Sequence, residues 1–244
     1  VGGAGPFLGG IVMSYVTYGR NGGADLWNRL TELGRIPLRW SVVTIAFFPL
    51  LAVLTGTIAF LTTGASFIID LGEVRALLGE PSAFVITVLV LLIVGPLPEE
   101  IGWRGYLLDR CQVRWSALTS GVTVGSVWAS WHAPLFLMPG YFANFDFDPS
   151  PVFFAANLLL ISVVYTWVYN NTNRSVLALI GFHFMENFVG QMTSLPRTAE
   201  PVGIALRILV VLGITAWFGA RTFRKDGTLP SPPSPAAPRD TSRH

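Results

Sequence analysis

Charged residues are scarce in this sequence. Asp, Glu, Lys and Arg together make up 12% of its 244 residues, whereas soluble domains carry about 25%. A water-soluble domain of this length needs a charged surface to cover its core, and this chain has too few charges to provide one. Hydrophobic residues make up 52% of the chain and the mean hydropathy is +0.55, which indicates a membrane protein.

Cysteine and clustered basic residues are also lacking. Cys111 is the single cysteine, which excludes an internal disulfide framework and any zinc site built from several cysteines. The formal net charge is +2, and the basic residues are spread along the chain without forming a basic patch. We therefore expect no nucleic-acid partner.

Strand-like alternation of apolar and polar residues is absent, while long apolar runs are present. A run of about 20 apolar residues spans a bilayer as a helix, and helices satisfy every backbone polar group inside lipid. We predict an all-α, polytopic transmembrane helix bundle. About seven spans are expected, over residues 4–18, 41–63, 82–108, 116–138, 151–169, 174–192 and 202–220. Because Val1 already lies in an apolar run, we expect an eighth span before it in the full protein.

The basic residues between the spans predict the orientation. If seven spans alternate, one side of the membrane carries Arg20, Arg29, Arg35, Arg39, Arg110, Arg114, Arg174, Arg221, Arg224 and Lys225. The other side carries fewer basic residues among acidic ones: Arg75, Arg197 and Arg207 with Asp70, Glu73, Glu80, Asp146, Asp148 and Glu200. The positive-inside rule places the Arg-rich side, and with it the C-terminus, in the cytoplasm. The localisation predicted is an integral, multi-pass cell membrane protein.

The sequence contains one domain and a tail. Residues 1–225 form the predicted transmembrane domain. Within it, residues near 21–38 mix Leu26, Trp27 and Leu30 with basic residues, which is typical of an amphipathic helix at the membrane interface. Residues 226–244 are rich in Pro and Ser and have little to bury, so we expect a disordered cytoplasmic tail.

A first cluster of polar residues occurs where lipid should exclude it. The run "PEEIGWR" contains Glu99, Glu100 and, four residues after Glu100, Arg104. On a helix Glu100 and Arg104 share a face, whereas Glu99 points about 100° away. One carboxylate can then be neutralised by Arg104 while the other faces a cavity. The alternative is a helix end at Pro98 followed by an ordinary cytoplasmic loop.

Two further clusters lie in later spans. His132 follows Trp128 by one turn in "WASWH", and His183 shares a helix face with Asn187 in "HFMEN". Alternatively, His132 is a hydrogen-bonded histidine of the core, and His183 and Asn187 make polar contacts between helices. Ionisable residues inside membranes are more often functional, and all three clusters fall in the cytoplasmic half of the membrane or near its midplane. A shared site is therefore possible.

Two mechanisms fit this set of residues. Glu99 and His132 can polarise a water molecule as nucleophile while His183 and Asn187 donate hydrogen bonds to the oxyanion. Alternatively, Glu99, His132 and His183 can bind one divalent metal such as zinc with an open coordination position. The sequence leaves this choice open, although we prefer the mechanism that requires no cofactor.

The three motifs resemble those of the CPBP family of intramembrane endopeptidases, which includes the type II CAAX prenyl endopeptidases. That family is marked by Glu-Glu-x-x-x-Arg, Phe-x-x-x-His and His-x-x-x-Asn/Asp, in this order on separate membrane helices. The resemblance implies that Glu99 activates water with His132, that Glu100 and Arg104 support them, and that His183 and Asn187 bind the oxyanion. Trp128 departs from the family, which usually has Phe, and a larger ring there narrows the cavity.

The predicted function is hydrolysis of a peptide bond in a membrane-associated or lipidated protein or peptide, and the other predicted partner is the lipid bilayer. Two alternatives remain. A catalytically idle member would act as a bacteriocin-immunity or scaffold protein, and a proton-coupled transporter would use its buried Glu and His as a relay. Intact motifs disfavour the first, and the absence of internal repeats disfavours the second.

Overall fold

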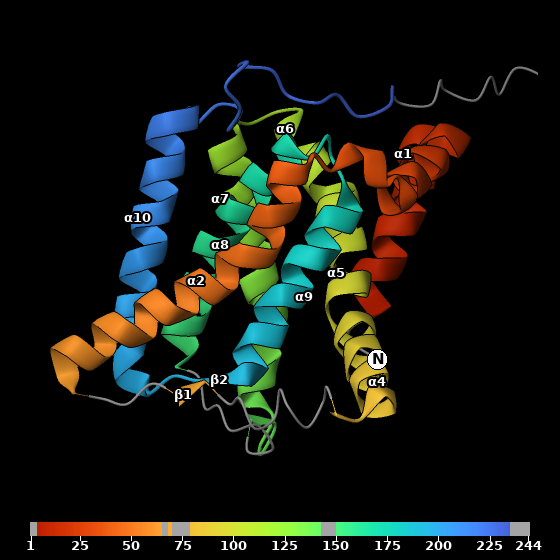
Figure 1. Ribbon diagram of the computed structural model, residues 1–244. Helices are drawn as coiled ribbons and strands as arrows, with labels where there is room; N and C mark the ends of the chain where they lie inside the picture. Colours follow the sequence, from red (N-terminus) through yellow and green to blue (C-terminus); the bar gives the residue numbers. More distant parts are fainter. Residues whose placement is uncertain (1–3, 65–67, 70–78, 143–149, 235–244) are drawn as a thin grey trace, which may run out of the picture.

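The protein is a bundle of α-helices, as predicted (Figure 1). The computed structural model describes residues 4–64, 68–69, 79–142 and 150–234. The helices are α1 (Ala4–Thr31), α2 (Leu38–Thr63), α4 (Pro81–Val94), α5 (Pro96–Gly102), α6 (Leu108–Gln112), α7 (Ala117–His132), α8 (Pro151–Asn171), α9 (Val176–Met192) and α10 (Glu200–Phe218). Short 3-10 turns cover Leu33–Arg35, Ala133–Leu137 and Arg197–Ala199, and Ile68–Ile69 (β1) pairs antiparallel with Thr193–Ser194 (β2).

Four helical stretches are long and apolar enough to cross a membrane: Leu38–Thr63, Pro81–Gln112, Pro151–Asn171 and Arg197–Phe218. The chain is therefore a membrane protein. Helices α7 and α9 have 16 and 17 residues, so each is somewhat shorter than the hydrocarbon core of about 30 Å. The count of seven spans stays a prediction.

The predicted span 116–138 is not one continuous α-helix. Helix α7 ends at His132, and a 3-10 turn follows over Ala133–Leu137. Pro134 lies in that turn, and because proline has no N–H it cannot continue the α-helical hydrogen bonding. The consequence is that His132 lies at the end of its helix and not deep within it.

The regular α-helix is interrupted twice in the stretch from 81 to 112, once on each side of the glutamate pair. Gly95, at φ −133° and ψ −73°, separates α4 from α5, where Pro96 and Pro98 interrupt the helical ladder. A π-helical turn (η2) then covers Trp103–Leu107, with the Leu108 N–H donating to the Trp103 carbonyl. The predicted continuation of the helix to Leu108 is confirmed, and π turns of this kind are frequent at functional sites.

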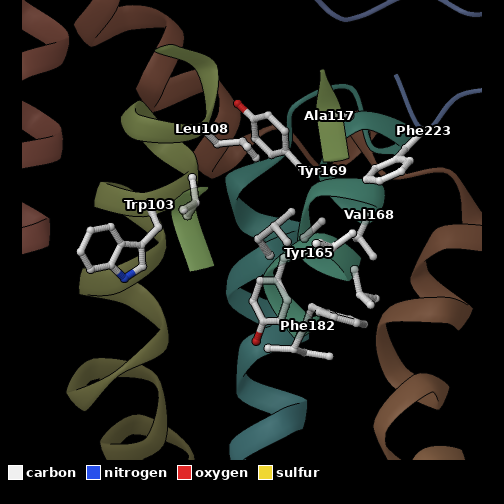
Figure 2. Packing of buried hydrophobic residues seen from close by; sticks show 14 of the residues in the cluster. Trp103, Leu108, Ala117, Tyr165, Val168, Tyr169, Phe182 and Phe223 are labelled. Carbon is white, nitrogen blue, oxygen red and sulfur yellow. The ribbon is translucent and has the colours of Figure 1, made fainter. Parts of the chain in front are cut away.

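Helix α8 forms the centre of the bundle. Ile161, Val164, Tyr165, Val168 and Tyr169 on it are fully buried, and Figure 2 shows Tyr165 beside Phe182 of α9. Small residues bring α7 against it. A side chain on Gly125 would start 2.8 Å from the Leu159 Cα atom, so only glycine permits this approach.

Helix α1 is kinked at Gly19, whose φ is 64° and ψ is −150°. The kink separates the predicted span 4–18 from the predicted amphipathic helix, which runs to Thr31. Trp27 and Leu33 are 65% and 71% exposed, whereas Leu26 packs inward against Ile101 and Ile180. The position of this segment at the membrane interface stays a prediction.

The loops predicted to share one side of the membrane do lie together at one end of the bundle. Arg174 forms ion pairs with Asp109 and Asp25, and Arg224 donates to the Asn170 carbonyl at 2.7 Å. The pair β1–β2 lies at the opposite end (Figure 1). Assignment of the first end to the cytoplasm stays a prediction. On the less basic side, Asp70, Glu73, Arg75, Asp146 and Asp148 lie outside the described residues.

The beginning of the predicted tail has neither helix nor strand over 226–234. It nevertheless contacts the bundle, because the Ser231 carbonyl accepts a hydrogen bond from Arg174 Nη1 at 3.2 Å. Residues 235–244 of the tail lie outside the described residues, so the predicted division at 225 and the disorder remain predictions.

Candidate functional site

Glu100 and Arg104 form the buried ion pair that their spacing predicts. Glu100 Oε1 lies 2.9 Å from Arg104 Nη1, and both side chains are 0% exposed. A buried carboxylate without a partner is strongly unfavourable, so Arg104 is the residue that allows a second carboxylate beside Glu99. The helix continues through both residues, which excludes the ordinary-loop alternative.

Arg104 is itself enclosed by α7 and α8. Its Nη2 donates to Ser162 Oγ at 3.2 Å. Its guanidinium carbon lies 4.7 Å from the centre of the Trp128 ring and 4.3 Å from that of Tyr165, so it makes cation–π contacts on two aromatic faces. Ser162 and Tyr165 did not emerge from the motifs. The signal that could have identified them is their polar character, three residues apart, in the apolar span 151–169.

His183 joins the same ion pair from α9. Its Nδ1 lies 2.9 Å from Glu100 Oε1, and the ring is 5% exposed. Helix α9 is set in place by Ser175, whose Oγ accepts from the Ala178 N–H at 3.1 Å in an N-cap. The first and third clusters of the sequence therefore meet, and Glu100, not Glu99, contacts His183.

Glu99 points to a different set of groups, as predicted from its helical position. One carboxylate oxygen, Oε2, accepts from Trp128 Nε1 at 2.5 Å and from Trp103 Nε1 at 3.4 Å. The side chain is 9% exposed. Trp128 thus links the second cluster to the first through its indole, a role that a Phe at this position cannot have.

His132 reaches the site through Trp128. Its Nδ1 lies 2.9 Å from the Trp128 carbonyl oxygen, so Nδ1 carries the proton and, in the neutral ring, Nε2 keeps its lone pair. The ring is half-buried and packs 5.4 Å from the Phe154 ring, between centres. A water shared directly by Glu99 and His132 stays a prediction.

Asn187 and the second oxygen of Glu99 face one point. A Cβ placed on Gly95 would lie 3.4 Å from Asn187 Nδ2 and 3.8 Å from Glu99 Oε1. The two polar atoms are therefore no farther apart than the sum of those distances, and both border the space that a side chain on Gly95 would occupy. A carboxylate oxygen and an amide donor beside one shared space are what a water and a carbonyl group require.

Glu186, on the flanking face of α9, is engaged elsewhere. Its Oε2 accepts from the Tyr165 hydroxyl at 2.6 Å. The same Tyr165 ring lies against Arg104, so this third carboxylate is connected to the site through one aromatic side chain.

The predicted metal ligands do not form a metal site as placed. Within residues 4–64, 68–69, 79–142 and 150–234, no three His, Cys, Asp or Glu side chains are arranged to hold a metal ion. Glu99 Oε2 is bonded to Trp128, and His183 Nδ1 to Glu100. The metal alternative with Glu99, His132 and His183 as ligands stays a prediction, and no step below passes through a metal.

Part of the chain matches a known protein family. Residues 81–189 match the family model described as type II CAAX prenyl endopeptidase Rce1-like. The resemblance predicted from the three motifs is confirmed. The Rce1-like segment includes every motif residue: Glu99, Glu100, Arg104, His132, His183 and Asn187. Helices α1, α2 and α10 lie outside it.

A curated relative points the same way. The chain is 27% identical over 145 residues to CAAX prenyl protease 2 of Methanococcus maripaludis, and the alignment covers 58% of this chain and 54% of that protein. The chain thus spans about half the length of the curated relative it matches.

Proposed function

We propose that the protein is an intramembrane endopeptidase that hydrolyses a peptide bond with water activated by Glu99. The observation that carries the proposal is that Glu99 Oε1 and Asn187 Nδ2 both border the space beside Gly95, inside an apolar bundle and next to a second carboxylate that is ion-paired with Arg104. Glu100 is held in an ion pair, whereas Glu99 has an oxygen that can take a proton. Two carboxylates in such different environments can have separate roles in acid–base chemistry.

In this proposal Glu99 and His132 orient and deprotonate the water, and Asn187 and His183 stabilise the oxyanion of the tetrahedral intermediate. His183 donates through Nδ1 to Glu100, so it can also donate through Nε2 only as the doubly protonated imidazolium. Glu100 Oε1, which accepts from that Nδ1, lies 2.9 Å away. Removal of one oxyanion donor costs about 10²–10³-fold in kcat in known hydrolases.

The proposed substrate is a membrane-associated or lipidated protein or peptide, since the site lies in a membrane-embedded bundle. The relative's printed name, a CAAX prenyl protease, supports this class. We propose a mechanism without a metal, because the three candidate ligands do not converge. We also propose that the site opens toward the cytoplasm, where the Arg-rich end of the bundle is predicted to lie.

The test compares new protein termini by mass spectrometry in matched cells that lack the native copy and express either the protein or its Glu99→Ala variant. Glu32→Gln serves as control, because Glu32 is an exposed carboxylate far from the site. Blotting must show equal amounts in the membrane. Termini that depend on Glu99 but not on Glu32 would establish proteolysis and identify the substrate. Identical termini in all three samples would favour a binding or immunity role.

A further inference from the structure

The two oxygens of the Glu99 carboxylate have different surroundings. Oε2 accepts two indole N–H groups, from Trp128 at 2.5 Å and Trp103 at 3.4 Å. In the described part of the chain these are the hydrogen bonds that the Glu99 side chain makes, and Oε1 takes no part in them. Oε1 instead borders the space beside Gly95, which the Asn187 amide borders as well.

Both tryptophans are positioned by the bundle and not by Glu99 alone. Trp128 is 2% exposed, with its ring over Arg104 and 5.6 Å from the Tyr165 ring, between centres. Trp103 is 8% exposed and lies on the π-helical turn directly before Arg104. Their N–H groups therefore have fixed directions, and they determine how the carboxylate is turned.

We propose that Trp128 and Trp103 hold Oε2 of Glu99 so that Oε1 is the oxygen that takes the proton from water, in the space that Gly95 leaves open. The proposal rests on the proposed function. It makes Trp128 and Trp103 positioning residues for the reaction, and it makes Gly95 the residue that reserves room for the reacting atoms.

The step balances as follows. Water gives one proton to Glu99 Oε1, and its oxygen forms a bond to the carbonyl carbon of the peptide. The carbonyl oxygen becomes an oxyanion facing the Asn187 amide. When this intermediate collapses, the C–N bond breaks and the proton on Glu99 passes to the leaving amine, which restores the carboxylate. No oxidant, reductant or further co-reactant is required.

Hydrogen bonds from N–H groups to a carboxylate are strong, so the loss of an indole donor frees the Glu99 carboxylate to turn. Trp128→Phe removes the shorter bond and keeps an aromatic ring over Arg104. We expect kcat to fall by about tenfold or more with KM changed little, because the carboxylate loses its orientation toward the water and not a contact with the substrate. The substrate is the peptide spanning the cleavage site found by the terminus comparison.

Trp40→Phe and Trp167→Phe are matched controls. Both tryptophans belong to the hydrophobic core region, and their Nε1 atoms are buried without a hydrogen-bond partner among the described residues. The same chemical change there should leave kcat and KM unchanged. A Trp128→Phe variant whose kcat equals that of the two controls would overturn the positioning role.

A second measurement does not depend on activity. Thermal unfolding in detergent is compared for the protein, Trp128→Phe, Glu99→Ala and the double variant. We expect Trp128→Phe to lower the Tm in the presence of Glu99 but to have little effect in the Glu99→Ala background, because the acceptor is gone. Equal shifts of the Tm in both backgrounds would contradict the hydrogen bond between Trp128 and Glu99, and this test needs no substrate.

The role of Gly95 is tested with Gly95→Ala. The added Cβ would meet Asn187 Nδ2 and Glu99 Oε1 at ordinary contact distances, so the variant should fold but lose at least tenfold in kcat. Gly213→Ala in α10 is the control, since nothing lies within 4 Å of that position. Full activity of Gly95→Ala overturns the assignment of Oε1. If the wild-type protein shows no cleavage that depends on Glu99, the proposed function itself is overturned.

Discussion

Glu100 and His183 are 83 positions apart in the chain, yet Glu100 Oε1 lies 2.9 Å from His183 Nδ1. The same oxygen also accepts from Arg104 at 2.9 Å. One buried carboxylate thus binds a guanidinium from its own helix and an imidazole from another. This contact joins the glutamate motif to the His183 motif, and it directs the opposite nitrogen of the ring, Nε2, away from Glu100.

The contact predicts that Glu100 is needed to hold His183 in place. Glu100→Gln removes the charge of the carboxylate that Arg104 and the His183 ring share, and the proposed mechanism uses the His183 ring as a donor to the oxyanion. We expect kcat to fall by about tenfold or more, with KM changed little. Glu32→Gln, at an exposed carboxylate, is the matched control, and equal kcat values in the two variants would contradict the role of Glu100.

Removal of Arg104 should destabilise the protein strongly. Arg104→Met leaves Glu100 buried with His183 as its remaining ionisable partner, and breaking a buried pair costs about 3–5 kcal/mol. The measurement is unfolding by denaturant in detergent micelles. Arg35→Met is the matched control, because the Arg35–Glu32 pair is exposed and such pairs contribute about 0–1 kcal/mol. Equal losses in the two variants would contradict the structural role of Arg104.

Much of this site was accessible from the sequence because it depends on local spacing. The Glu100–Arg104 pair follows from a separation of four residues on one helix, and the divergence of Glu99 follows from the helical rotation. Likewise, Trp128 lies one turn before His132, which is why its carbonyl meets the His132 ring. These relations need no knowledge of how the helices pack.

Relations between helices were not accessible. Nothing in the motifs indicates that His183 meets Glu100 and not Glu99, or that the Trp128 indole turns toward Glu99. Arg29 and Arg174 were predicted as loop residues on an Arg-rich side, yet they are only 2% and 5% exposed. The second half of α1, after the kink at Gly19, packs against the π-helical turn η2, and a long-range packing of this kind leaves no periodic pattern in the sequence.

Arg29 connects the second half of α1 to the site through hydrogen bonds. Its Nη2 donates to the Gly105 carbonyl at 2.8 Å and its Nη1 to the Tyr169 hydroxyl at 2.9 Å. Gly105 belongs to the π-helical turn that carries Arg104. We expect Arg29→Met to lower both the Tm and kcat. Arg29→Lys should lower them nearly as much, since a point charge cannot replace the guanidinium fork. Arg20→Met, at an exposed position on the same helix, should change neither, and comparable effects in both variants would contradict the role of Arg29.

Two adjacent glycines of α1 differ in their surroundings, so substitutions there distinguish the effect of the α1–α5 contact from the effect of helix propensity. A Cβ on Gly10 would lie 2.4 Å from the Ile101 carbonyl oxygen, whereas nothing lies within 4 Å of a Cβ on Gly9. Gly9→Ala should stabilise the helix by about 0.5–1 kcal/mol. Gly10→Ala must push α1 away from α5, which carries Glu99 and Glu100, so we expect a lower Tm and reduced cleavage. The comparison is made by thermal unfolding and by kcat/KM with the same peptide. Similar behaviour of the two variants would show that the close approach of α1 to α5 is not needed to hold the glutamates in place.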